Sequence, residues 1–210
     1  MKKRVLTAVL TAALVTGTCV ATVSAKEEKT YTIGICQLVQ HDALDAATKG
    51  FEDAITEKMG DSVKFDEQNA QGDSNTCSTI INSFVSEGTD LILANATASL
   101  QAAAAGTSDI PILGTAVTEY GVALGIDDFD GTVGGNISGT SDLAPIEEQE
   151  AMLKELFPDV KQVGLLYCSA EANSAYQISV VEAELTKLGY QCTEYSFADS
   201  NDIRHINGAR

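Results

Sequence analysis

The chain has 210 residues, of which 44% are apolar and 6% aromatic, and it carries 13 Lys and Arg against 30 Asp and Glu. This length provides one ordinary domain or two small lobes with enough apolar residues for a core, which argues against disorder. The formal net charge of −17 argues against a surface that coats nucleic acid or an anionic membrane, because both need clustered Lys and Arg.

The first 25 residues have the pattern of an export signal. A basic start, Met1–Arg4, precedes an apolar run at 5–15, and small residues at 23–25 provide a cleavage site. The apolar run is too short to remain as a membrane-spanning helix. We therefore expect an exported, extracytoplasmic protein, periplasmic or at the cell surface. An alternative is a lipid anchor at Cys19.

Four cysteines follow the signal: Cys36, Cys77, Cys168 and Cys192. An even number in an exported chain permits disulfides. Cys36 and Cys168, however, lie in apolar strand-like runs, where a lone buried thiol packs as a small hydrophobic side chain, and we favour that interpretation. With no CxxC motif and only His41 and His205 as histidines, we expect no zinc site.

Taken in chain order, the first half alternates short apolar runs with amphipathic ones. The pattern predicts strands at 31–37, 63–65, 91–94 and 111–114, and helices at 43–59, 74–87 and 99–105. Gly60 and Gly88 are expected to end the first two helices, and Ser74 is a candidate cap for the second. Because the strands are apolar on both faces, this order predicts a parallel sheet covered by helices.

The next segment interrupts this alternation. Residues 117–140 contain six glycines and little periodicity, so we expect a crossover or hinge region rather than a core element. The first lobe would then span 30–116. A partial second lobe at 141–203 would follow, with helices at 147–157 and 175–188 and strands at 163–167 and 191–197.

The second lobe has half of the elements that a complete lobe would need. Residues 204–210 carry two Arg and no helical apolar face, so we interpret them as an aberrant tail of a C-terminally truncated chain. Missing neighbours would leave apolar faces uncovered. We therefore expect this chain to close poorly on a ligand.

Ligands of open parallel sheets bind beyond the carboxyl ends of the strands. Those ends are rich in hydroxyl and amide groups, at 37–41, 95–99, 114–118 and 169–174. Several precede helices, whose free N–H groups favour a carboxylate. Such an arrangement suits a small zwitterion whose ammonium group meets Asp142 or Glu171.

Each of these polar residues also has an ordinary interpretation. The serines could cap helices, and Asp142 could be a turn residue. His41 and Asp42 are adjacent and cannot readily form a base and its orienting partner. No nucleophile elbow or phosphate-binding loop stands at a strand-to-helix turn. We therefore expect neither catalysis nor a cofactor.

Four segments together resemble the tryptophan/tyrosine-type substrate-binding proteins of ABC importers. They are residues 33–45, 114–118, 136–142 and 169–174, within a resemblance that spans about 30–203. The resemblance implies an α/β, two-lobed, periplasmic-binding-protein-like fold of type I with parallel sheets, its second lobe incomplete here. It also implies an aromatic amino acid as ligand, held in a cleft between the lobes, and a membrane permease as partner.

The resemblance also implies positions for the ligand-binding residues. The first lobe would contribute Gln37, His41, Thr97, Ala98, Thr115 and Ala116. The second lobe would contribute Thr140, Ser141 and Asp142, with Asp142 meeting the ammonium group. It would also hold the carboxylate side and the cleft entrance through Ser169, Glu171, Asn173, Ser174 and Gln177.

The leading hypothesis is thus an extracytoplasmic binding protein that works by hinge closure. The alternative is a ligand-sensing receptor domain of the same fold, for a sugar or other small molecule, that is not coupled to transport. An enzyme ranks third, and no nucleic-acid partner is expected.

Overall fold

The computed structural model describes residues 29–198 and residue 202. The predicted export signal at 1–25, the candidate lipid anchor at Cys19 and the interpreted tail at 204–210 lie outside the described residues. They remain predictions.

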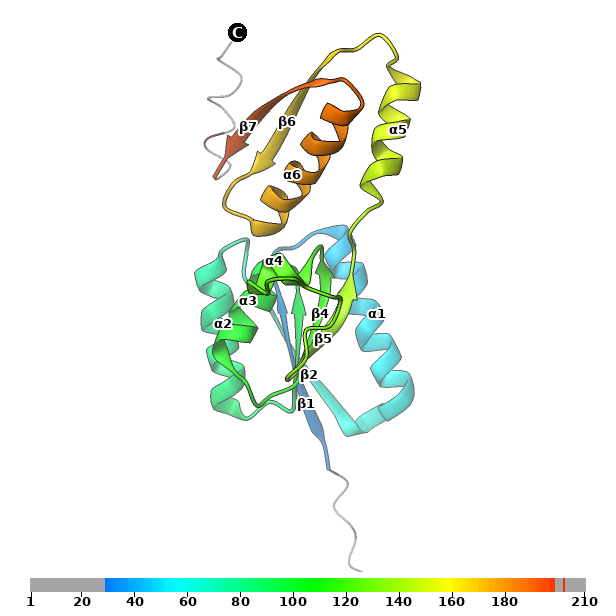
Figure 1. Ribbon diagram of the computed structural model, residues 1–210. Helices are drawn as coiled ribbons and strands as arrows, with labels where there is room; N and C mark the ends of the chain where they lie inside the picture. The colour runs from blue at the N-terminus through cyan, green and yellow to red at the C-terminus, as the bar shows by residue number, and fades with distance from the viewer. Residues whose placement is uncertain (1–28, 199–201, 203–210) are drawn as a thin grey trace, which may run out of the picture.

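Five parallel strands form the first sheet, in the order β2-β1-β3-β4-β5 (Figure 1). The strands are β1 (Tyr31–Gln37), β2 (Val63–Asn69), β3 (Leu91–Asn95), β4 (Ile112–Val117) and β5 (Ile137–Ser141). The helices between them are α1 (Asp42–Met59), α2 (Ser74–Glu87), α3 (Thr97–Gly106) and α4 (Tyr120–Leu124), with a short 3-10 turn, η1 (Gly60–Ser62), after α1. This is the parallel, helix-covered sheet that the sequence predicts.

The helices cover both faces of the first sheet. On one face, Phe51 and Ile55 of α1 pack against Ile33 and Ile35 of β1. On the other face, α2, α3 and α4 enclose a larger cluster centred on Phe84. Side chains along a strand alternate between faces, which explains why β1 is apolar on both faces over residues 33–36.

Local signals at the helix ends account for most of the boundaries. The Nδ1 atom of His41 accepts a hydrogen bond from the Ala43 N–H at the start of α1. Asp73, rather than the predicted Ser74, caps α2 by accepting from the Thr76 N–H at 2.6 Å. Gly88 ends α2 in the left-handed conformation at φ 73°, which glycine adopts without steric cost.

The prediction for residues 117–140 is wrong where it excluded core elements. This segment contributes α4 and the start of β5, and β5 pairs with β4 as the edge strand of the first sheet. Tyr120 is buried in the main core cluster. The segment escaped recognition because β5 has only five residues and is mostly exposed, so it has no apolar run.

The second sheet has two parallel strands, β6 (Gln162–Cys168) and β7 (Gln191–Phe197). The accompanying helices are α5 (Ile146–Leu156) and α6 (Ala172–Lys187). The buried apolar residues of this lobe cluster around Leu165, Leu185 and Tyr190, which join α6 to the sheet. All four elements were predicted from the sequence, with small differences at their ends.

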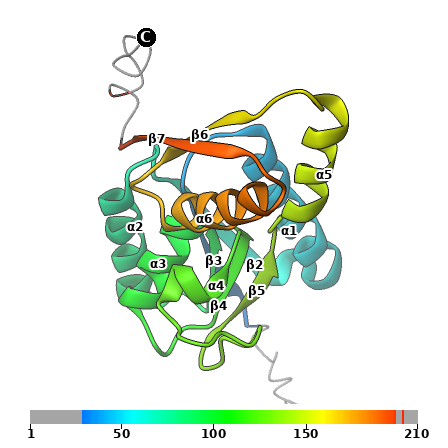
Figure 2. The same ribbon diagram turned by 45° about the horizontal axis from the view of Figure 1, so that its top comes forward.

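The carboxyl ends of the two sheets face each other. In Figure 1 the strands of the first sheet point toward the second lobe, and β6 and β7 point back toward the first. The segment after β5 leads directly into α5, and α6 contacts α4. Figure 2 shows α6 lying over the strand ends of the first sheet. The polar residues at the carboxyl ends of the two sheets, which we call the first and the second rim, are therefore opposed.

Candidate functional site

The first rim follows the carboxyl ends of β1, β3, β4 and β5. The Ala96 N–H donates to the Thr115 carbonyl at 3.0 Å, which ties the end of β3 to that of β4. Ala96 and Ala116 have φ values of 90° and 52°. Positive φ in a non-glycine residue costs about 1–3 kcal/mol and is concentrated at functional sites. Two of the four such residues in the described part of the chain lie on these neighbouring strand ends, and the other two are Gln71 and Asp128.

Three of the predicted residues surround these backbone positions. Thr97 is buried at the first turn of α3, and Ala98 follows it half-buried. Thr115 is half-buried in β4, where the pairing with β5 shifts register between Gly114 and Val117. Together with Ala96 and Ala116 they present backbone groups and hydroxyls at one place on the rim.

Gln37 lies beneath this rim and is already fully engaged. Its side-chain amide donates to Asp45 Oδ1 at 2.6 Å and to the Val39 carbonyl at 3.0 Å. Its Oε1 accepts from Thr48 Oγ1 at 2.7 Å and from Asn95 Nδ2 at 3.3 Å. Every donor and acceptor of the amide is thus used. The geometry favours a role in bracing β1, α1 and β3, while His41 is exposed at the edge of the rim.

Thr140, Ser141 and Asp142 stand on the first lobe, which corrects the predicted assignment to the second. Thr140 and Ser141 end β5, and the Asp142 N–H donates to the Val117 carbonyl at 3.1 Å. Ser141 Oγ donates to the Thr118 carbonyl at 2.7 Å. All three residues are exposed, and Asp142 directly follows the end of β5.

Tyr120 holds this end of β5 against β4, and sequence reasoning missed it. Its hydroxyl donates to the Thr140 carbonyl at 3.2 Å. Burial raises the pKa of Tyr120 to about 12, and the charge of Asp142 adds to the effect. A Cβ atom on Gly114 or Gly139 would collide with its phenol oxygen, so both positions need glycine. The sequence signal that could have revealed this contact is the presence of Gly114 and Gly139 on either side of Tyr120 in the chain.

The second rim is formed by the end of β6 and the start of α6. The Ser169 N–H and Oγ both donate to the Phe197 carbonyl, at 2.8 and 3.3 Å. Glu171 precedes α6 and is half-buried. The Asn173 Oδ1 atom is buried and has no hydrogen-bond partner among residues 29–198. Gln177 donates back to the Asn173 carbonyl at 3.3 Å, beside the half-buried Ser174.

Side-chain capping differs among the helices. Side chains of His41, Asp73 and Glu119 cap α1, α2 and α4. Within the described part of the chain, no side chain caps α3, α5 or α6, of which α3 begins at the first rim and α6 at the second. Uncapped first-turn N–H groups, with the helix dipole, form a favourable place for a carboxylate. An anionic group could therefore be bound from either rim.

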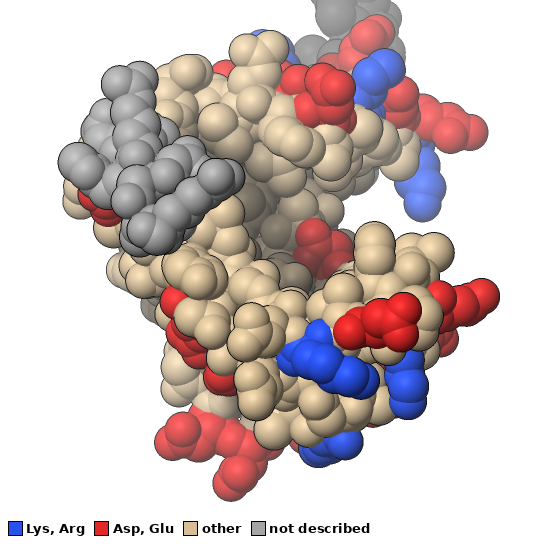
Figure 3. All heavy atoms as spheres, turned by 90° about the horizontal axis from the view of Figure 1, so that it is seen from above, with Lys and Arg blue, Asp and Glu red and all other residues tan. Residues whose placement is uncertain are grey.

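Acidic side chains on the rims complement these donors. Asp142 of the first rim and Glu171 of the second are available for an ammonium group. On the face shown in Figure 3, acidic side chains are scattered over the surface, which is hollowed between two thicker parts. Donors for a carboxylate and acceptors for an ammonium group thus occur on the same opposed rims.

The cavities of the first lobe and of the interlobe segment are lined by neighbours of the predicted residues and not by those residues themselves. A cavity of about 330 Å³ is lined by Tyr120, Phe129 and the glycine-rich loop before β5. Another of about 390 Å³ lies between residues 143–148 and the α6 residues Tyr176 and Val180. Neither lining includes a predicted site residue. In the described ranges there is no cluster of three metal-ligating side chains, and no helix is long and apolar enough to cross a membrane.

A family model for the ABC transporter substrate binding protein matches residues 32–208. The chain belongs to this family. The family consists of extracytoplasmic substrate-binding proteins and not enzymes, which agrees with the prediction that the protein is not an enzyme. The resemblance stated from the sequence is thereby confirmed.

Similar proteins bind aromatic amino acids according to their names. A tyrosine-binding protein of Clostridioides difficile (strain R20291) is 41% identical over 179 residues, which are 84% of this chain and 52% of that protein. A Streptococcus pneumoniae ABC domain in complex with L-Trp is 33% identical with a TM-score of 0.79, covering 84% of this chain and 60% of the other. The chain thus spans about half the length of its curated relative.

A further solved structure is a ligand-free, open substrate-binding protein with adhesive properties from Clostridium difficile. It is 38% identical, with a TM-score of 0.62, over 85% of this chain and 62% of that one. These likenesses establish an α/β fold of the type I periplasmic-binding-protein class for the substrate-binding protein described here.

Proposed function

We propose that the protein binds an aromatic amino acid between its two lobes and delivers it to an ABC importer. The observation that carries the proposal is the opposition of two rims, each with an uncapped helix N-terminus and an acidic side chain. An α-amino acid has one anionic and one cationic group on the same carbon, so it needs both kinds of partner in one crevice. The tyrosine-binding relative and the relative in complex with L-Trp support tyrosine or tryptophan as the ligand.

The roles of the predicted residues follow from their positions. Asp142 would accept from the ligand ammonium group on the first rim. The first turn of α6, with Asn173 and Ser174, would donate to the carboxylate from the second rim. Thr97 and Thr115 would bind the ligand from the bottom of the crevice, close to the strained backbone at Ala96. Gln37 would hold these strand ends in place through its hydrogen bond with Asn95, without touching the ligand.

Hinge closure would bring the rims onto the ligand. The residues that join β5 to α5 connect the lobes, and α4 contacts α6 beside them. Of the two solved relatives above, the L-Trp complex matches the backbone of this chain better, with the higher TM-score. The ligand-free, open protein matches less well, although it is more similar in sequence. A change in the angle between two lobes produces this pattern. Only a ligand that binds the closed state more tightly can drive the change.

The partner and the location follow from the same proposal. A binding protein of an importer docks on a membrane permease, and the predicted export signal would deliver it outside the cytoplasm. Cys19 would serve as a lipid anchor if that signal is processed as in lipoproteins. Both statements rest on the family and on residues that the structure does not describe.

Isothermal titration calorimetry of the full-length protein tests the proposal. We expect saturable binding of L-tyrosine or L-tryptophan, and none of tyramine, which lacks the carboxylate, or of 3-(4-hydroxyphenyl)propionate, which lacks the ammonium group. Asp142→Asn should weaken binding about 10- to 100-fold, as expected for loss of a hydrogen bond to a charged group. The exposed Asp61→Asn is the matched control. Equal affinity for the amino acids and both analogues would overturn the proposal.

A further inference from the structure

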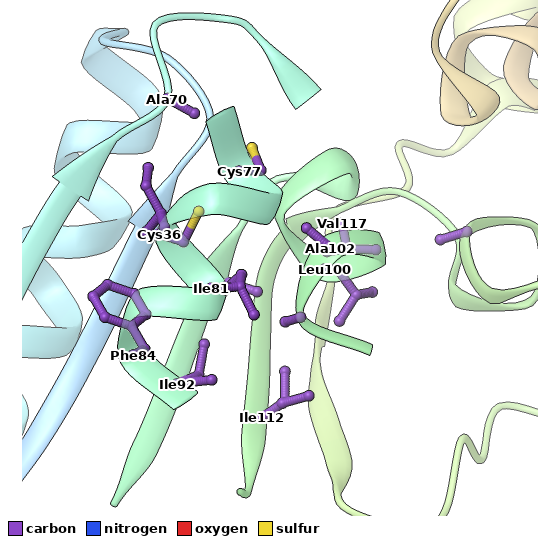
Figure 4. Packing of buried hydrophobic residues seen from close by; sticks show 14 of the residues in the cluster. Cys36, Ala70, Cys77, Ile81, Phe84, Ile92, Leu100, Ala102, Ile112 and Val117 are labelled. Atoms are coloured by element: carbon purple, nitrogen blue, oxygen red, sulfur yellow. The ribbon is translucent and has the colours of Figure 1, made fainter. Parts of the chain in front are cut away.

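Two thiols and a hydroxyl meet inside the first lobe. Cys36 lies near the end of β1, Cys77 in the first turns of α2, and Ser99 in α3, and all three are completely buried. Each cysteine Sγ lies 3.6 Å from Ser99 Oγ. Figure 4 shows Cys36 and Cys77 close together at one end of the core cluster. Cys36 is a free, buried thiol in the core, as predicted, but a second buried thiol, Cys77, lies in the same cluster.

The environment makes the two thiols unequal. The hydrogen bond from Cys36 lowers the pKa of Cys77 to about 7, against the effect of burial, and Ser99 lowers it further. The pKa of Cys36 is raised by the hydrogen bond to Cys77 and then by burial. Of the two thiols, Cys77 is therefore the one that loses its proton more readily. A thiolate beside a thiol is the reactive form in thiol–disulfide exchange.

We propose that Cys36 and Cys77 are a redox pair that closes to an intramolecular disulfide in the presence of a low-molecular-weight disulfide. The Cys77 thiolate attacks one sulfur of that oxidant, and the first thiolate product leaves. Cys36 then gives its proton to the first thiolate product and attacks the Cys77 sulfur, and the second product leaves as a thiolate that takes a proton from water. Two protein thiols are oxidised and one external disulfide is reduced to two thiols. Extracytoplasmic compartments are oxidising enough to supply such a reagent.

The surroundings of Cys77 provide a route to it. Residues 71–76, which precede it, are exposed, so opening of the first turn of α2 uncovers the sulfur. Cys36 adjoins Gln37 and Ser99 adjoins Ala98, so the bridge would lie directly beneath the first rim. Closing it would tie β1 to α2 across roughly 40 residues of chain and stiffen that rim alone.

The second lobe contains a matched control. Cys168 pairs with Phe197, and Cys192 pairs with Val163, at opposite ends of the parallel strands β6 and β7. Five residues of strand separate the two positions, roughly 16 Å at 3.3 Å per residue. A disulfide needs Cα atoms within about 7 Å, so this pair cannot close without rearrangement.

Oxidation of the full chain tests the proposal without any ligand. Reduced protein is incubated with oxidised glutathione, free thiols are trapped with N-ethylmaleimide, and disulfides are mapped by mass spectrometry without reduction. We expect a Cys36–Cys77 bridge with loss of two hydrogen atoms, while Cys168 and Cys192 do not bridge each other. The bridge should raise the melting temperature by on the order of 10 °C, reversibly with dithiothreitol.

Two cysteine variants test which residues form the bridge. Cys36→Ala should leave a mixed glutathione disulfide on Cys77, whereas Cys168→Ala should leave the bridge unchanged. If Cys36→Ala fails to fold, the disulfide map of the wild-type protein still tests the proposal. Free Cys36 and Cys77 after every other thiol has reacted would overturn the proposal, as would a bridge that forms equally between Cys168 and Cys192. Neither result would bear on amino-acid binding, because no ligand is present.

Discussion

The strands β1 and β6 both have seven residues and are mostly apolar, but their burial is very different. Five of the seven residues of β1 are buried, while β6 has one in that class. β1 lies between β2 and β3 with helices on both faces, whereas β6 pairs only with β7 among the described strands. Burial is therefore set by the number of neighbours around a strand. Stability should be concentrated in the first lobe.

The largest expected effect is in the main core of the first lobe. Phe84 is completely buried, so Phe84→Ala should lower the free energy of unfolding by about 3–5 kcal/mol. Leu166 of the second sheet is 56% exposed, and Leu166→Ala should cost less than about 0.5 kcal/mol. Urea denaturation measures both. Equal losses would contradict the contrast between the sheets.

A close approach in β1 gives the next effect. A Cβ atom on Gly34 would lie 2.6 Å from the Phe84 ring, so Gly34→Ala should destabilise the protein by about 3 kcal/mol. Gly50, inside α1, has open space at that position. Gly50→Ala should stabilise by about 0.5–1 kcal/mol through helix propensity. The same denaturation assay should give opposite signs, and a neutral Gly34→Ala would refute the packing argument.

The polar network beneath the first rim should contribute less. Thr48→Val keeps the shape of the side chain but removes the hydroxyl that bonds Gln37 and Asn95. We expect a loss of about 1–2 kcal/mol from the two lost hydrogen bonds to buried amides. Thr56→Val, at an exposed position of the same helix, should be close to neutral. If the two substitutions have equal effects, the network does not brace the rim.

The smallest effect is a pH dependence in the second lobe. Burial, followed by repulsion from Glu184 and Glu147, raises the pKa of Glu150. The folded state therefore binds this proton more tightly than the unfolded state, and its contribution to stability is lost as pH rises from the unfolded pKa through the folded one. Glu150→Gln should flatten that decline, and the exposed Glu155→Gln should not. Thermal melts between pH 4 and 8 measure the slope.

Much of the fold could be predicted because its signals are local. Periodicity gave β1 and β7 with their observed bounds, and Gly60 and Gly88 marked the ends of helices. β5 could not be found this way, since it is recognisable only through its pairing with β4. The assignment of Asp142 to the second lobe failed for the same reason.

The candidate site, like the fold, could be predicted only where its signals are local. The strand-end rule located both rims, because parallel strands place their carboxyl ends along one edge. It could not find the contact of Tyr120 with the end of β5, nor the meeting of Cys36 with Cys77, because these depend on contacts between distant segments. The residues that touch the ligand remain predictions.

Hydrogen exchange measured by mass spectrometry, with and without L-tyrosine, tests most directly whether a ligand binds between the opposed rims. We expect slower exchange at 95–99 and 115–118 on the first lobe and, together with them, at 169–177 on the second. Protection confined to one lobe, or no change at saturating L-tyrosine and L-tryptophan, would contradict binding between the lobes.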